Sequence, residues 1–168
     1  MQFSDIAQIM DIESVSFGAY HWSCEAFASE IENKLGHYLT VIDKSNQKVI
    51  GYCGFWLIFD EAHITTIAVH PDYRKMSVGE LLLQKLIESG WKNNAKWFTL
   101  EVRASNLAAQ NLYYKYGFKS LGLRRKYYQD NDEDAMIMWT ENINDSAFKE
   151  IFKERQKELT DRKVVNAC

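Results

Sequence analysis

Arg74-Lys75-Met76-Ser77-Val78-Gly79-Glu80 is the stretch that decides the fold, because it joins a strand pattern to a helix pattern. Residues 62–69 before it are apolar and partly β-branched, as in a strand. After it, apolar residues recur every four positions at Val78, Leu82 and Leu86, which predicts an amphipathic helix. The stretch is therefore predicted to be a strand-to-helix turn.

This turn has the features of an anion-binding site. The first N–H groups of a helix lack partners within the helix and attract negative groups. Arg74 and Lys75 add positive charge beside them, and Gly79 permits a close approach of the backbone. Many ordinary strand-to-helix turns also contain a glycine and a basic residue, so the turn alone leaves both interpretations open.

Strand and helix patterns continue on both sides of the turn. Helices are predicted near the N-terminus, after a capping Ser23, from Val78, around 109–116 before Gly117, and over 144–159. Strands are predicted over 37–43, 48–59, 62–69, 97–102, 118–128 and 135–139, and residues 18–22 as a loop. The order predicts an α/β fold with a mixed, mostly antiparallel central sheet and helices on both faces. The strand–helix–strand unit over 62–102 should be right-handed if its two strands are parallel neighbours.

Composition limits the classes of protein. A chain of 168 residues without repeats or linkers indicates a single domain, 1–168, and a net charge of −3 argues against a nucleic-acid binder. Three scattered cysteines and four histidines lack the spacing of a disulfide framework or a metal site, so no metal is expected. The first twelve residues do not resemble a signal peptide, and no stretch is apolar enough to span a membrane. A reducing cytoplasm is therefore the expected location.

Two further segments carry polar residues in unusual places. Glu101 lies in the otherwise apolar strand 97–102, where it is either a surface residue or a site residue. Asn106 and Tyr113 are seven positions apart, nearly two helical turns, and should share a face. A tyrosine on a helix face is more often part of the core than of a site, so the segments alone leave their roles open.

Taken in order, these three segments resemble the GNAT superfamily of acetyltransferases. The phosphate loop of that family has the pattern Arg/Gln-x-x-Gly-x-Gly/Ala before a long helix, and residues 74–79 match it except that Ser77 replaces the first glycine.

More closely, the chain resembles the bacterial ribosomal-protein-alanine N-acetyltransferases. The similarity covers residues 3–141 and includes Glu-Val-Arg-x-Ser-Asn at 101–106 and Arg-Arg-x-Tyr-Tyr at 124–128. Trp22-Ser23 matches the end of a Pro-Trp-Ser segment, with His21 in place of the proline. The helical tail, 142–168, lies outside the resemblance and is expected to dock on the domain or on a partner.

The resemblance implies a role for each segment, with acetyl-CoA as acetyl donor. Glu101 would be the general base and Tyr113 the general acid that protonates the leaving thiolate. The residues implied in cofactor binding are Ile67, Ala68 and Val69 for the pantetheine arm, Arg74, Lys75, Met76, Ser77, Val78, Gly79 and Glu80 for the pyrophosphate, and Asn106. The residues implied in binding the peptide are Trp22, Tyr127 and Tyr128.

The implied reaction is direct attack of an amine on a thioester, and the amine must first lose a proton. At pH 7 this costs roughly 1 kcal/mol for an α-amine and about 4–5 kcal/mol for a lysine. The N-terminal amine of a protein is therefore the easier substrate. The resemblance implies that this protein is a ribosomal protein. Two alternatives remain: a GNAT enzyme for lysine or a small amine, decided by the loops at 18–22 and 126–133, and a CoA-binding regulatory module with weak catalysis, suggested by Ser77.

Overall fold

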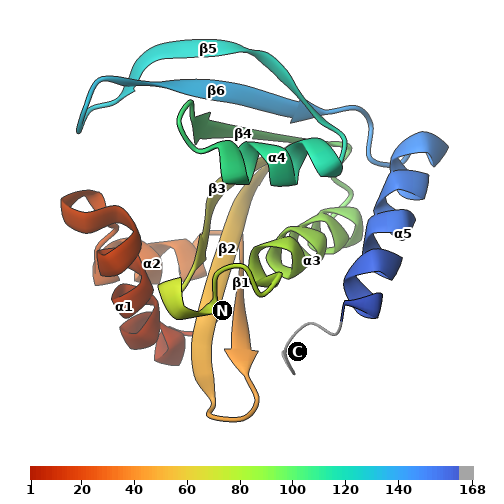
Figure 1. Ribbon diagram of the computed structural model, residues 1–168. Coiled ribbons are helices and arrows are strands. Elements are labelled where there is room, and N and C mark those ends of the chain that lie inside the picture. Colours follow the sequence, from red (N-terminus) through yellow and green to blue (C-terminus); the bar gives the residue numbers. More distant parts are fainter. Residues whose placement is uncertain (163–168) are drawn as a thin grey trace.

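The computed structural model describes residues 1–162, and Figure 1 shows their arrangement. The described chain contains five α-helices: α1 (Ile6–Phe17), α2 (Cys24–Glu32), α3 (Val78–Lys92), α4 (Leu107–Lys115) and α5 (Ser146–Asp161). Its six strands are β1 (Gly36–Asp43), β2 (Lys48–Ile58), β3 (Glu61–Val69), β4 (Trp97–Arg103), β5 (Phe118–Tyr128) and β6 (Glu133–Thr140). Most predicted elements agree with these bounds to within two residues. The predicted loop at 18–22 begins with a short 3-10 helix, Gly18–Tyr20, and the last six residues of the predicted tail lie outside the described residues.

The six strands form one mixed sheet in the order β1-β2-β3-β4-β6-β5. All neighbours are antiparallel except β3 and β4, which are parallel and are joined through α3. This parallel pairing covers only three residue pairs, from Glu61 with Trp97 to His63 with Thr99. Beyond them the two strands diverge, and the sheet opens in its middle (Figure 1).

A β-bulge in β3 lies at the point where the strands diverge. Ile64 is opposite Phe55 of β2 and Thr66 is opposite Gly54, so Thr65 is an extra residue on β3. The hydroxyl groups of Thr65 and Tyr38 lie 3.0 Å apart, within hydrogen-bond distance. Because a bulge bends and twists its strand, this one accounts for the turn of β3 away from β4.

Helices cover both faces of the sheet, as the sequence predicted. Residues of β2 point to both sides of the sheet: Ile50 and Cys53 join the core beneath α3, whereas Val49 and Tyr52 pack with α1 and α2. A β-bulge at Ile50 shifts the alternation along this strand by one residue. Figure 1 shows α1 and α2 on one side of β2 and α3 on the other. Val78, the first residue of α3, is buried in the same core, and Val69 at the end of β3 packs against that core. The start of α3 therefore lies beside the end of β3.

Helix α5 lies against α3 and buries Phe148, Phe152 and Leu159. The ring of Phe152 meets that of Trp91 edge-on at 4.7 Å between centres, and the Trp91 indole N–H donates to the carbonyl of Ile143 at 3.1 Å. Burying a side chain of this size contributes about 1.5–3 kcal/mol. The helix is therefore part of the packed structure rather than a solvated end.

Candidate functional site

A cavity of about 580 Å³ occupies the space where β3 and β4 diverge. Its walls come from α1, the segment leading to α2, both diverging strands, α4 and the β5–β6 hairpin. Six of the residues predicted for the site line it: Trp22, Ile67, Glu101, Asn106, Tyr113 and Tyr128. The opening of the sheet thus brings together residues that lie up to 106 positions apart in the sequence (Trp22 to Tyr128).

Tyr113 presents a protonated hydroxyl at this cavity. The side chain is 7% exposed, and its ring packs against that of Phe118 at 5.5 Å between centres. Burial raises the pKa of Tyr113 far above its usual value, so the hydroxyl keeps its proton at neutral pH. Among residues 1–162 no hydrogen-bond partner is found for this hydroxyl, which leaves it free to donate to a bound molecule.

Glu101 faces the same cavity from β4. Its side chain is partly exposed, and its Oε1 lies 3.1 Å from Nη1 of Arg124 on β5. Arg124 is itself more than half exposed, so water screens this ion pair. The ion pair with Arg124 orients the carboxylate of Glu101 and leaves it accessible to a substrate.

Asn106 caps α4 and also borders the cavity. Its Oδ1 accepts a hydrogen bond from the Ala109 N–H at 3.1 Å. The side-chain NH₂ group remains as a donor for a ligand. Asn106 and Tyr113, whose spacing of seven predicted a shared face, both line the cavity.

The backbone at the start of α3 is suited to an anion. Ser77 is the N-cap residue with φ 62° and ψ 10°, and its side chain makes no capping hydrogen bond. The N–H groups of the first turn are thus left without a side-chain partner. A Cβ on Gly79 would lie 3.7 Å from the nearest atom, on Val69, so protein packing leaves room beside this residue.

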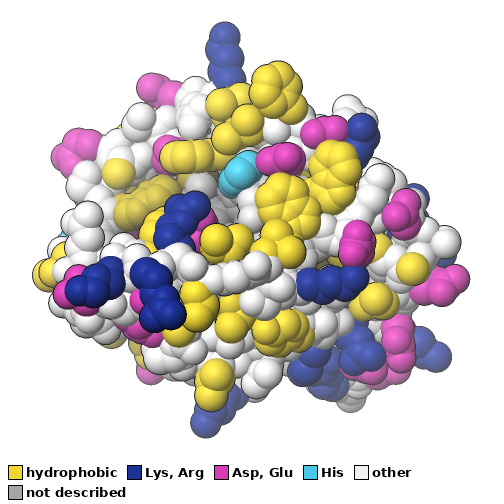
Figure 2. Space-filling view, turned by 90° about the horizontal axis from the view of Figure 1, so that it is seen from above, with side chains coloured by type: hydrophobic (Ala, Val, Ile, Leu, Met, Phe, Trp, Pro, Cys, Tyr) yellow, Lys and Arg dark blue, Asp and Glu magenta, His cyan; other side chains and the backbone are white. Residues whose placement is uncertain are grey.

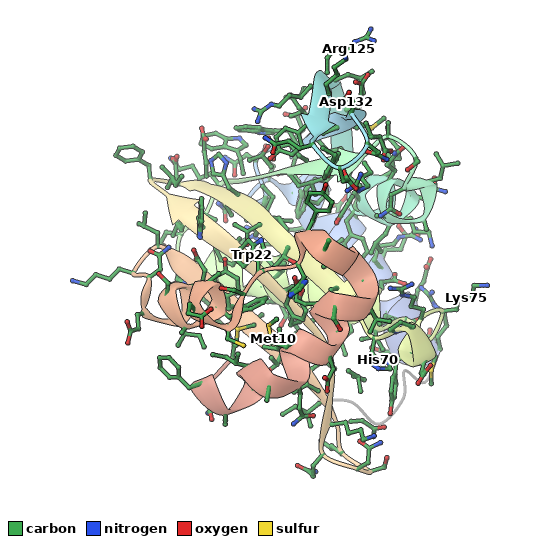
Figure 3. All side chains as sticks on the ribbon, turned by 90° about the vertical axis from the view of Figure 1, so that its left-hand side faces the viewer. Met10, Trp22, His70, Lys75, Arg125 and Asp132 are labelled. Carbon is green, nitrogen blue, oxygen red and sulfur yellow. The ribbon has the colours of Figure 1, made fainter. Side chains whose placement is uncertain are left out.

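The side chains of the predicted phosphate loop point in different directions, and few of them are available to an anion. Arg74 donates to the carbonyl of Val69 and to the Ser16 hydroxyl, both at 3.3 Å, so it ties the loop to β3 and α1. Lys75 extends outward from the loop (Figure 3), and Met76 is exposed. Glu80 points into the protein and is nearly buried. The loop therefore offers an anion mainly its backbone.

The remaining predicted residues lie outside the cavity lining. Ala68 is buried on the α1 side of the sheet, and Val69 ends β3. Tyr127 is 41% exposed, with its ring edge-on to that of Tyr128 at 5.2 Å. On the side of the molecule where β5 and β6 lie, hydrophobic side chains sit between acidic and basic ones (Figure 2). Of the two adjacent tyrosines, the structure brings only Tyr128 to the cavity.

An ionic network that the sequence analysis did not identify holds the hairpin against β4. Arg103 pairs with Asp130 at 2.8 Å and with Glu133 at 3.1 Å, and its guanidinium carbon lies 3.9 Å from the centre of the Tyr128 ring. Hydrogen bonding from Ser105, whose N–H is 2.8 Å from Glu133, lowers the pKa of Glu133 to about 2. Burial, in turn, raises the pKa of Tyr128 to about 12. The network fixes the tyrosine as a wall of the cavity.

Glu13 is a second carboxylate at the cavity that the sequence analysis did not single out. It is 2% exposed on α1, and its Oε2 accepts a hydrogen bond from the Trp22 N–H at 2.8 Å. Burial raises the pKa of Glu13. The only signal in the sequence is that this glutamate shares a face of the first helix with apolar residues.

Glu13→Gln is expected to stabilise the protein at neutral pH. Because the pKa of Glu13 is raised on folding, the charged form opposes folding once the pH exceeds the unfolded value near 4.3. The gain in melting temperature should therefore appear as the pH rises from 4 to 7.5 and vanish at the acid end. Thermal unfolding at several pH values measures this.

The control for Glu13→Gln is Glu141→Gln on the surface. Hydrogen bonding from Lys119 lowers the pKa of Glu141, so its replacement should give no gain at neutral pH. A loss of stability in Glu13→Gln at pH 7.5 would show that the bond from Trp22 outweighs the cost of burying the charge.

Residues 1–162 lack two further features. None of their helices is both long and apolar enough to cross a membrane. Within the same residues, no cluster of three or more His, Cys, Asp or Glu side chains is placed to hold a metal ion.

Comparison with known proteins gives matches over most of the chain. Residues 6–118 match the acetyltransferase (GNAT) family. The ribosomal protein bS18-alanine N-acetyltransferase of Escherichia coli K12 is 40% identical over 122 residues, which cover 71% of this chain and 80% of that protein. A Bacillus subtilis protein that carries this name provisionally is 44% identical over 140 residues, covering 83% of this chain and 91% of that protein.

The fold agrees with these matches. The crystal structure of the ribosomal-protein-S18-alanine N-acetyltransferase from Escherichia coli is similar with a TM-score of 0.75 and 33% identity, covering 84% of this chain and 90% of that one. The predicted family and the predicted fold are thereby confirmed: the chain belongs to the acetyltransferase (GNAT) family.

Proposed function

We propose that this enzyme transfers the acetyl group of acetyl-CoA to the N-terminal α-amine of a protein, with the N-terminal alanine of a ribosomal protein as its substrate. The observation that carries the proposal is the cavity between β3 and β4, which joins Glu101, Tyr113 and Asn106 in one space. The names of the Escherichia coli and Bacillus subtilis relatives support the choice of acceptor.

The donor side of the site fits acetyl-CoA, which supplies an activated acetyl group as a thioester. The N–H groups at the start of α3, over 75–80, suit the pyrophosphate. Beyond His63, the edge of β3 that faces β4 has no strand partner, so its backbone groups can bind the amides of the pantetheine arm. Asn106, at the end of this path, has a side-chain donor for the same molecule.

On the acceptor side, Glu101 takes the proton of the attacking amine, directly or through a water molecule. Tyr113 donates its proton to the sulfur that leaves. Backbone N–H groups on the unpaired edge of β3, from the cavity toward Val69, stabilise the oxygen on which negative charge develops. Holding both substrates in one cavity supplies a further advantage through proximity.

The walls of the acceptor side favour a positively charged peptide end. Four carboxylates line the cavity, those of Glu13, Glu101, Asp130 and Glu133, against the single guanidinium of Arg103 among the described lining residues. A protonated α-amine is attracted to this net negative surface before it is deprotonated. Trp22 and Tyr128 supply flat apolar walls for the first residues of the peptide.

The function is tested with acetyl-CoA and two peptides of the same sequence, each with an N-terminal alanine and one internal lysine. One peptide has a free N-terminus and the other is blocked there. Mass spectrometry should find one acetyl group, on the alanine of the free peptide only. Acetylation of the lysine in both peptides would support a lysine acetyltransferase instead, and binding of acetyl-CoA without transfer would support a regulatory module.

Ser77→Gly is expected to raise the free energy of unfolding and to tighten acetyl-CoA. A left-handed conformation costs a residue with a Cβ roughly 1–2 kcal/mol, and Ser77 has φ 62°. Glycine relieves this cost, but it also loses more conformational entropy on folding than serine does. The net increase in the free energy of unfolding should therefore be about 1 kcal/mol. Space released for the pyrophosphate should improve affinity by up to about tenfold. Thermal unfolding and calorimetry measure the two effects.

Lys75→Gly is the matched control, because Lys75 has the same φ of 62° but adds a positive charge. It should gain stability and lose affinity. Weaker binding by Ser77→Gly would mean that the serine hydroxyl itself contacts the phosphate.

A further inference from the structure

The buried side chain of Glu80 links the donor site to the C-terminal helix. Glu80 lies in the first turn of α3 and is 6% exposed. Its two carboxylate oxygens face the two terminal nitrogens of Arg162, with Nη1–Oε2 3.1 Å and Nη2–Oε1 3.2 Å. The Tyr116 hydroxyl donates to the same carboxylate at 3.2 Å and accepts from Gln84 at 2.7 Å. Arg162 is thus the cationic partner of a buried anion.

The position of this anion matters for the donor site. The start of a helix favours negative charge, and a carboxylate there competes with a bound phosphate for the same field. An unpaired carboxylate in a nearly buried position also repels a phosphate with little screening by water. A bidentate ion pair with a guanidinium offsets the charge of the carboxylate and fixes the orientation of its two oxygens. The first turn of α3 can then bind a pyrophosphate despite containing Glu80.

The packing of helix α5 against α3 holds Arg162 beside Glu80. Phe152 packs against Trp91 of α3 and against Tyr116, with ring centres 4.7 and 6.3 Å apart. Near the end of the helix, Gln156 donates to Glu88 at 3.1 Å. Nε of Arg162 donates to the carbonyl of Glu158 at 3.2 Å, which sets the direction of the guanidinium. The contacts run along α3 and end at its first turn.

We propose that Arg162 is a positioning residue for the acetyl donor, which neutralises Glu80 so that the start of α3 accepts the pyrophosphate of acetyl-CoA. This inference rests on the proposed use of acetyl-CoA. It gives the C-terminal helix a part in donor binding, although that helix lies outside the segment that matches the family, 6–118. The effect should depend on the phosphates of the donor and not on its acetyl group.

The test compares Arg162→Ala, Glu80→Gln and the double variant with two donors, acetyl-CoA and S-acetylpantetheine, which lacks the pyrophosphate. Arg162→Ala should raise the KM and the calorimetric Kd for acetyl-CoA about tenfold, with little change in kcat. Its kcat/KM with S-acetylpantetheine should equal that of the unmodified protein. Adding Glu80→Gln to Arg162→Ala should restore the Kd to within about twofold, because the unpaired charge is then gone.

Arg155→Ala is the matched control on the same helix, because Arg155 pairs only with Glu154 and Glu158 among residues 1–162. It should leave both donors unaffected. Equal losses with both donors, or no recovery in the double variant, would overturn the role of Arg162. If the unmodified protein binds acetyl-CoA but acetylates no peptide, the proposed function fails while the Kd comparison still decides the inference. If it does not bind acetyl-CoA, both fail.

Discussion

Replacing Tyr113 with phenylalanine should lower kcat for peptide acetylation by about a hundredfold or more, the usual effect of losing a general acid. The hydroxyl faces the cavity and stays protonated because burial raises its pKa. Phenylalanine keeps the ring and its contact with Phe118, so the cavity keeps its shape. Acetyl-CoA should therefore bind with nearly unchanged Kd, as measured by calorimetry beside steady-state kinetics.

Tyr114→Phe supplies the control for the same chemical change one position away. Tyr114 is 45% exposed, and its hydroxyl contacts the sulfur of Met136 outside the cavity. Its loss should leave kcat within about twofold of the unmodified value. A Tyr113→Phe variant that turns over normally would remove this hydroxyl from the mechanism.

Glu101→Gln should also lower kcat by about a hundredfold or more, because the amide cannot accept the proton of the amine. Its ion pair with Arg124 is exposed, so losing that pair should cost little stability. An α-amine has a pKa of about 7.7–8.0, and above this range the peptide reaches the site already deprotonated. The deficit of the variant should therefore shrink between pH 7 and pH 9, as a pH–rate profile would show.

Glu61→Gln is the corresponding control, since Glu61 lies at the start of β3 and faces His63 away from the cavity. It should change neither kcat nor its pH dependence. A constant deficit of Glu101→Gln across this pH range would contradict removal of the substrate proton as its role and indicate an effect on peptide binding.

The local parts of the fold were predictable because neighbouring residues determine them. Ser23 caps α2 through its hydroxyl, which accepts from the Ala26 N–H at 3.2 Å, as its place before that helix predicted. The spacing of Asn106 and Tyr113 likewise predicted that they share a face. The family resemblance added Glu101 to this pair, since an isolated glutamate in an apolar strand gives no indication of its partners.

The parts that sequence reasoning missed depend on contacts between distant residues. Glu80 and Arg162 are 82 positions apart. The family pattern places Glu80 in the phosphate loop, but nothing in the sequence indicates that its side chain points inward. Arg103 and Glu133 meet only because β4 pairs with β6. The bulge at Thr65 depends on how β2 and β3 align, and an alternating pattern on one strand does not reveal this alignment.

The short pairing of β3 with β4 has a consequence for local stability. An interior strand normally protects its amide hydrogens from exchange with solvent deuterium, because neighbours on both sides bond to it. In this sheet the amides of residues 64–69 that point toward β4 face the opening instead. They should exchange rapidly although they lie at the centre of a six-stranded sheet, and slowly once a donor occupies that edge. The least protected part of the sheet would then be the part that recognises the ligand.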